Sequence, residues 1–162
     1  MYFKLSVFCF ILISFAANFS LSQTDQDQTG SGYDSSYAQK LGADDYGMKT
    51  YVMAFLRSGE VSSENKEESQ RLQMVHLKNI IRLAEEGVLV LAGPFMSNDQ
   101  DIRGIYIFDV TTVEEAKKLT ETDPAIQAGV LVMELIPWYG SAALMELNDI
   151  HKKIQKISIT DQ

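Results

Sequence analysis

The sequence predicts an α+β domain, a four-stranded antiparallel sheet with two main helices on one face and an extra helix after the last strand. Two observations carry this prediction. Strand-like and helix-like segments alternate in the order β-α-β-β-α-β between residues 49 and 138. A further helical stripe follows Trp138, formed by Leu144, Leu147, Ile150, Ile154 and Ile157. The domain therefore spans residues 49–138, and residues 139–162 form a C-terminal helical extension.

The N-terminus has the pattern of a secretory signal peptide over residues 1–22. A basic start containing Lys4 precedes an apolar run, and small residues stand before Gln23 at a cleavage position. We therefore expect a secreted or periplasmic protein. An uncleaved N-terminal anchor is the alternative. Residues 23–48 are rich in Gln, Ser, Gly and Asp, which predicts a flexible polar leader.

Charge and cysteine content exclude several classes of function. Cleavage after Ser22 removes Lys4 and changes the net charge from −8 to −9. Such an acidic chain is not expected to bind nucleic acid or, after signal cleavage, a membrane. The single cysteine, Cys9, leaves with the signal peptide, so a disulfide, a thiolate nucleophile and a cysteine-bound zinc are all excluded. We expect no metal and no cofactor.

The first half of the domain begins with a β-branched and aromatic run at Thr50–Gly59, which predicts a strand. Ser62 or Ser63 is expected to cap the helix that follows, and Gly87 suits the position just after its end. An apolar strand is then predicted at Val88–Phe95, ending at Pro94.

The second half begins with a third strand at Arg103–Val110. Thr112 and Glu115 form a capping box that opens a helix running to about Glu121. Asp123 followed by Pro124 has the pattern of a helix N-cap and first position, so a short helix is expected there. The fourth strand is predicted at Gly129–Trp138.

The first strand is apolar on both faces, because Tyr51, Met53 and Phe55 alternate with other apolar residues. A sheet with one face in water normally alternates apolar with polar residues. Something must therefore cover the second face. The simplest cover is a second copy of the same sheet, so we expect a homodimer. The C-terminal helix is the rival cover.

His76 is a candidate functional residue because it interrupts an apolar helix face. It lies between Leu83 and Ile80 on a helical projection, whereas Asn79 falls on the polar side. A histidine in such a place needs a polar partner. Asp123 is the natural candidate and would make His76 a general base. Both residues also have structural explanations: a histidine bonded to backbone, and a simple helix cap.

The segments "HLKNIIRLAEEGVLVLAGPF", "RGIYIFDVTTVEEAKKLTETDPAIQAGVL" and "MELIPW" resemble the YCII-related (YciI-like) family from about Thr50 to Trp138. The resemblance implies a ferredoxin-like fold that dimerises into an α/β barrel. It also implies a His/Asp active site, which maps onto His76 and Asp123. One member is a dehydrochlorinase of chlorinated hydroxyquinols. The leader and the helix after Trp138 depart from the short members of the family.

Together these features predict an enzyme that performs acid–base chemistry of lyase, dehalogenase or isomerase type on a small organic molecule. His76 would move the proton and Asp123 would hold the imidazole. Gly93, Pro94 and Arg103 are candidate substrate-binding residues. Arg103 can also be explained as the polar residue at the end of a strand. The alternative is a non-catalytic binding or assembly module. An enzyme predicts Asp123 in reach of His76 beside an open cleft, and a module predicts a filled pocket.

Overall fold

The computed structural model describes residues 32–62 and 65–161. The predicted signal peptide and the first part of the leader lie outside these residues, so export stays a prediction. The chain from Asp34 onward is one compact unit. Its elements are, in order, α1 (Ser35–Leu41), β1 (Met48–Ser58), α2 (Lys66–Glu85), β2 (Leu89–Pro94), β3 (Ile102–Phe108), α3 (Val113–Thr120), α4 (Pro124–Gln127), β4 (Leu131–Ser141), the 3-10 helix η1 (Ala142–Glu146) and α5 (Leu147–Ile154).

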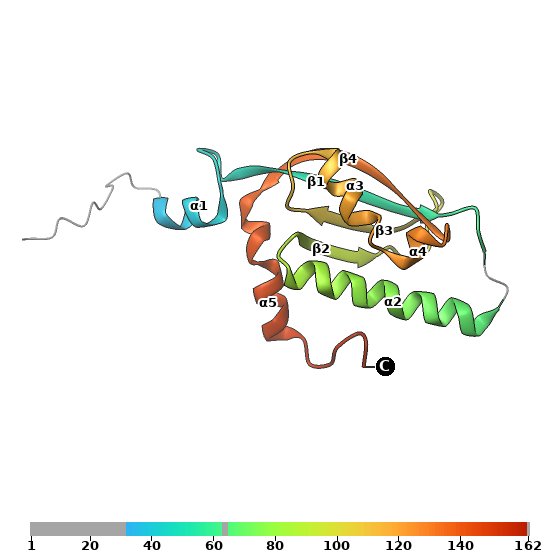
Figure 1. Ribbon diagram of the computed structural model, residues 1–162. Helices are drawn as coiled ribbons and strands as arrows, with labels where there is room; N and C mark the ends of the chain where they lie inside the picture. The colour runs from blue at the N-terminus through green and yellow to red at the C-terminus, as the bar shows by residue number, and fades with distance from the viewer. Residues whose placement is uncertain (1–31, 63–64, 162) are drawn as a thin grey trace, which may run out of the picture. The chain divides into compact units, whose positions relative to one another are not determined.

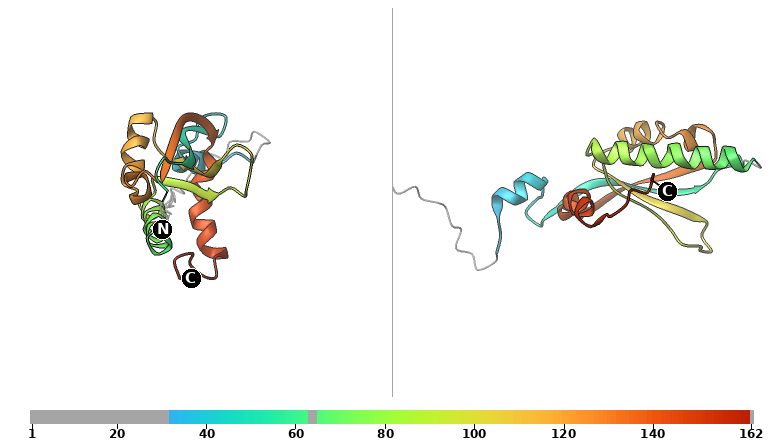
Figure 2. Two further views of the ribbon diagram at one scale, coloured as in Figure 1. Left: turned by 90° about the vertical axis from the view of Figure 1, so that its right-hand side faces the viewer. Right: turned by 90° about the horizontal axis from the view of Figure 1, so that it is seen from below.

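The four strands form one antiparallel sheet in the order β2-β3-β1-β4 (Figure 1). The two helices α2 and α3 lie on the same side of it (Figure 2). This arrangement confirms the predicted βαββαβ order and the ferredoxin-like α+β fold. In the described residues no helix combines the length and apolar character needed to cross a membrane.

The main core lies between the sheet and the two helices. It contains Val52, Ala54 and Leu56 of β1, which pack with Leu83 of α2 and Ala116 of α3. These three β1 residues are spaced by two and therefore point to the same face of the sheet. Tyr106 and Phe108 of β3 join the same cluster. The core thus places β3 directly beneath α2.

A second cluster lies on the opposite face of the sheet. Tyr51 and Ile107 pack there against Leu144 and Met145, which belong to η1. The C-terminal extension therefore covers one end of this face. Farther along β4, Val132 and Ile136 remain 47% and 42% exposed. The prediction of two apolar faces is confirmed by this burial, whereas the predicted homodimer is not tested by one chain.

The leader prediction for residues 23–48 needs correction in its second half, because Ser35–Leu41 is helical. Asp34 caps this helix by accepting from the Tyr37 backbone N–H. Gly42 ends it with a φ of 71°, a left-handed conformation that favours glycine. Polar composition argued for flexibility, but a cap at each end defines a short helix.

At α2, α3 and α4, side chains close in sequence cap the first turn and determine where the helix begins. Thr112 and Glu115 form the predicted capping box, and Asp123 caps α4 as predicted. The α2 helix is capped by Asn65 rather than by Ser62 or Ser63. The C-terminal stripe is also divided: β4 continues to Ser141, and η1 precedes a shorter α5 than the periodicity predicted.

Candidate functional site

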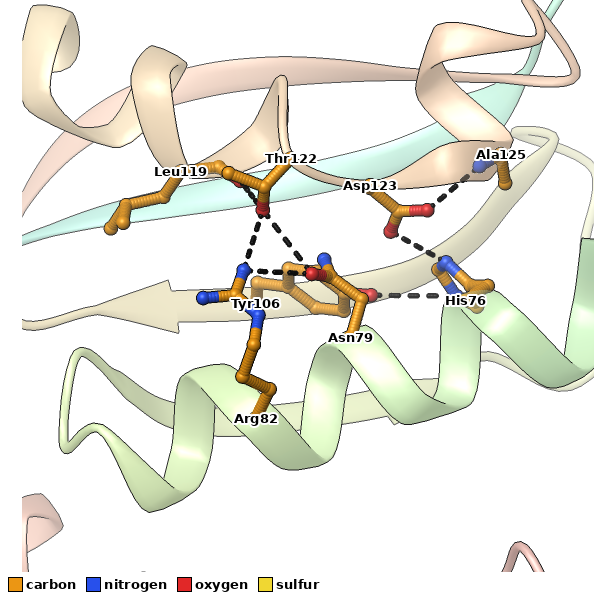
Figure 3. A network of polar contacts seen from close by, with 8 residues as sticks. All are labelled: His76, Asn79, Arg82, Tyr106, Leu119, Thr122, Asp123 and Ala125. Atoms are coloured by element: carbon orange, nitrogen blue, oxygen red, sulfur yellow. Dashed lines mark hydrogen bonds and ion pairs between the residues drawn. The ribbon is translucent and has the colours of Figure 1, made fainter.

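His76 lies in the middle of α2 and faces the α3–α4 connection. It is 6% exposed, which agrees with its place in the apolar arc. Its Nδ1 atom lies 2.7 Å from Oδ2 of Asp123, across 47 residues of sequence. The predicted partnership is therefore present in the structure (Figure 3).

Asp123 uses its two carboxylate oxygens for different partners. Oδ1 accepts the backbone N–H of Ala125, which caps α4, and Oδ2 faces His76. The side chain is fully buried. Because a carboxylate can only accept, the proton between the two residues belongs to His76 Nδ1. The other ring nitrogen, Nε2, then carries the lone pair that a general base needs.

Tyr106 of β3 stands on the Nε2 side of the imidazole. Its hydroxyl lies 3.4 Å from Nε2, and the two rings are nearly parallel, with centroids 6.3 Å apart. Burial raises the pKa of the Tyr106 hydroxyl, and the negative charge of Asp123 adds to the effect. The hydroxyl therefore stays protonated and donates toward Nε2. The sequence predicted Tyr106 on a strand but carried no signal of a function for it.

A second polar network lies one turn further along α2. Oδ1 of Asn79 accepts from Nη2 of Arg82 at 2.8 Å and from the Thr122 hydroxyl at 3.2 Å. Arg82 also donates to the Thr122 hydroxyl, so α2 is bonded to the end of α3 at this level (Figure 3). Asn79 is 8% exposed, which corrects its assignment to the polar side. Within the described chain its Nδ2 atom has no hydrogen-bond partner.

An unpartnered buried amide of this kind is costly. Leaving a buried donor unsatisfied costs about 1–3 kcal/mol. The sequence offered no local signal for this, because Asn79 looks like any polar residue of an exposed helix face. Its burial comes from the α3–α4 connection, which contributes Thr122 and packs over α2.

A pocket of about 190 Å³ lies next to the His76–Asp123 pair. Its lining comes from the first half of α2, from α4 and from the start of β4, and consists of Ser69, Leu72, Gln73, Ala125, Val130 and Leu131. Leu72 and Gln73 stand one turn before His76. His76 itself is not among the lining residues.

The other predicted site residues lie elsewhere. Gly93 pairs with Ile105 and Pro94 with Gly104 in the β2–β3 ladder. Arg103 donates from Nε to the Ser58 hydroxyl at 2.9 Å and pairs with Asp101. The structure does not bring these three residues to His76, and their substrate-binding role stays a prediction. In the part of the chain that the structure describes, no three potential ligand side chains cluster as a metal site.

The sequence of the domain matches the family model of the YCII-related domain over residues 50–139. The chain belongs to the YCII-related family. This match includes His76 and Asp123. It covers the whole sheet except the first two residues of β1 and the last two of β4. The extension that carries η1 and α5 lies beyond it.

One similar solved structure is 5-chloro-2-hydroxyhydroquinone dehydrochlorinase from Burkholderia phenoliruptrix AC1100, in complex with 2,5-dihydroxybenzoquinone. It shares 18% sequence identity, covers 54% of this chain and 90% of its own chain, and has a TM-score of 0.36. A likeness of this size says nothing about the substrate of the present protein. No curated protein matches the chain.

Proposed function

We propose that this YCII-related protein is a small-molecule enzyme in which His76 and Asp123 act as an acid–base pair. The observation that carries the proposal is the 2.7 Å contact between Nδ1 and Oδ2 in a buried setting. Asp123 holds the imidazole in one tautomer and stabilises the positive charge that forms when Nε2 takes a proton. A simple helix cap needs only Oδ1, so the second oxygen has a separate use.

The neighbouring pocket supports a small and largely apolar substrate. Leu72, Val130 and Leu131 are apolar, and its polar side chains, Ser69 and Gln73, carry no charge. Pockets that bind organic ligands commonly combine an apolar lining with a few polar groups. A substrate held there would lie beside the imidazole, and the chemistry would be proton transfer of lyase, dehalogenase or isomerase type.

A non-catalytic binding or assembly module is the second candidate, and the closed surroundings of His76 favour it. The Tyr106 hydroxyl faces Nε2, and His76 is not part of the pocket lining. In that case the polar contacts would serve only to join α2 to the α3–α4 connection.

Substituting one histidine at a time distinguishes the enzyme from the non-catalytic module. The chain has two histidines, and His151 is exposed on α5, so it provides a matched control. The protein would be tested on small carbonyl compounds and chlorinated hydroxyquinols, with deuterium uptake and chloride release as readouts. For any activity found, we expect His76→Gln to lower kcat by about 10²–10⁴-fold and His151→Gln to leave it unchanged. Equal activities of the two variants would exclude a catalytic His76.

We also propose that the protein forms a homodimer through the free part of the second sheet face. Val132 and Ile136 are exposed there, and Met53, Phe55 and Ile105 are only partly buried. Burying these side chains against a second copy would remove apolar surface from water. Closed two-fold dimers are the commonest homo-oligomers.

A further inference from the structure

The orientation of the Asn79 amide is determined by its neighbours. A guanidinium group can only donate, so the atom that faces Arg82 Nη2 at 2.8 Å must be the acceptor Oδ1. The reversed amide would place donor against donor. The two N–H groups of Nδ2 therefore point away from Arg82. Figure 3 shows this amide on the side of α2 that faces Asp123.

The same network makes Asn79 a stronger hydrogen-bond donor. Arg82 polarises the amide carbonyl, and the guanidinium is itself paired with Glu86 at 2.8 Å. Hydrogen bonds arranged in a chain strengthen one another in a buried setting. Asn79 also follows His76 by three residues, a spacing that places their Cβ atoms about 5–6 Å apart on one helix face. A base and an unused donor thus stand side by side.

We propose that Asn79 is a substrate-binding residue whose Nδ2 donates to an oxygen of the substrate. This assignment rests on the proposed function, because a proton taken by His76 leaves negative charge on the substrate. Donors that are already oriented toward this charge stabilise the transition state. The buried Nδ2 has no hydrogen-bond partner within the described chain and therefore has the free hydrogen-bonding capacity for this role.

The pairing of His76 with Asn79 defines a class of substrate. It is a small neutral compound with an acidic hydrogen on the carbon next to a carbonyl group. The C–H bond breaks and the proton goes to Nε2 of His76. The electron pair forms a carbon–carbon double bond, and the carbonyl oxygen becomes an enolate that Asn79 binds. Return of the proton to another carbon gives isomerisation, and loss of a leaving group with its electron pair gives elimination.

The Tyr106 hydroxyl makes only a weak contact with Nε2. Its O···N distance of 3.4 Å exceeds the usual range for a hydroxyl donor, which is centred at about 2.7–2.8 Å. A substrate hydrogen therefore competes with a weak contact rather than a strong one.

The test uses 4-nitrophenol, whose anion mimics an enolate and is coloured. The full-length protein would be titrated with the dye across the pH range in which the free dye ionises. We expect the wild-type protein to bind the anion preferentially, which lowers the apparent pKa of the bound dye. Asn79→Asp keeps the acceptor for Arg82 and Thr122 but loses the donors, and should bind the anion about tenfold more weakly or worse. Gln155→Glu, an equal change of charge on the exposed C-terminal segment, should bind like the wild type.

Two further measurements keep the test independent of charge and folding. Asn79→Leu removes the donors without adding charge and should weaken binding to a similar degree. In the wild-type protein, the side-chain amide resonances of Asn79 should shift when the dye binds. The assignment would be overturned if the wild type did not bind the dye, if both Asn79 variants bound it as tightly as the wild type, or if the amide resonances did not respond. Binding that depends on Asn79 while His76→Gln keeps full activity would uphold it and contradict the proposed catalytic role instead.

Discussion

Asp123 links local and long-range structure through a single carboxylate. Its Oδ1 accepts a hydrogen bond from the Ala125 backbone N–H at the start of α4, and its Oδ2 contacts Nδ1 of the His76 ring. Pro124 contributes as well, because proline fits the first position of a helix and needs no hydrogen-bond acceptor. The α4 cap therefore fixes the place of the carboxylate, and the carboxylate fixes the imidazole. Asparagine at this position would keep the cap but would no longer supply a negative charge.

Removal of the Tyr106 hydroxyl should change how stability depends on alkaline pH. In the folded wild-type protein, burial raises the pKa of the Tyr106 hydroxyl above its unfolded value of about 10. The stabilisation is therefore complete below about pH 10 and is lost as the pH rises above that value. We expect the free energy of unfolding to fall above about pH 10 by up to ~1.4 kcal/mol per pH unit from this group.

Tyr106→Phe keeps the ring that packs edge-to-face on Phe108, with centroids 5.7 Å apart, and abolishes the titration. The variant should therefore lose stability less steeply than the wild type above about pH 10. Urea unfolding at a series of alkaline pH values would measure both slopes. Parallel slopes would mean that Tyr106 ionises as easily in the folded protein as in the unfolded chain.

Single-residue signals revealed part of the candidate site. His76 stood out because it interrupts an apolar face, and Asp123 stood out because it precedes Pro124. Tyr106 and Asn79 gave no such signal. Tyr106 reaches His76 because β3 pairs with β1 so that Tyr106 lies opposite Ala54, under α2. Strand register and the packing of the α3–α4 connection are long-range properties, which local patterns do not encode.

The α2 helix ends in a motif that the sequence predicted correctly. Gly87 adopts a φ of 76°, its N–H donates to the Ala84 carbonyl, and Val88 N–H donates to the Leu83 carbonyl. These two bonds define a Schellman motif. The start of α2 was predicted less well, because several adjacent polar residues can cap a helix and only the final backbone path selects one of them.

Gly87→Ala tests this ending without steric complications. A Cβ atom at Gly87 would meet nothing within 4 Å, so the cost is that of the left-handed backbone alone. We expect a loss of about 1–2 kcal/mol in the free energy of unfolding. Gly87→Asn should lose less, since asparagine tolerates this conformation better. Both would be measured by urea unfolding.

Gly93 on β2 is the matched control. A Cβ there also meets nothing within 4 Å, but its φ is not positive. Gly93→Ala should therefore change stability little. A Gly87→Ala variant as stable as Gly93→Ala would show that the helix end can relax into another conformation.

In the molecule as a whole, the sheet has two apolar faces that are covered differently. The α2 and α3 helices cover one face, while η1 covers only one end of the other. The residue pattern of β1 predicted both apolar faces, because its apolar residues do not alternate with polar ones. It could not predict how far the C-terminal segment extends over the second face. That depends on where β4 ends and the chain turns, at Ser141.

The uncovered part of this face gives the clearest prediction for the assembled protein. Ile136 on β4 is 42% exposed and pairs with Met53 on β1, near the centre of the free surface. In a dimer formed through this surface, Ile136→Glu would bury an unpaired carboxylate, which costs several kcal/mol. We therefore expect light scattering to give twice the monomer mass for the wild type and the monomer mass for Ile136→Glu. Ile154→Glu, at a 75% exposed position on α5, should remain dimeric. If the wild type is a monomer at micromolar concentration, η1 is the cover that this face has in solution, and the α/β barrel does not form.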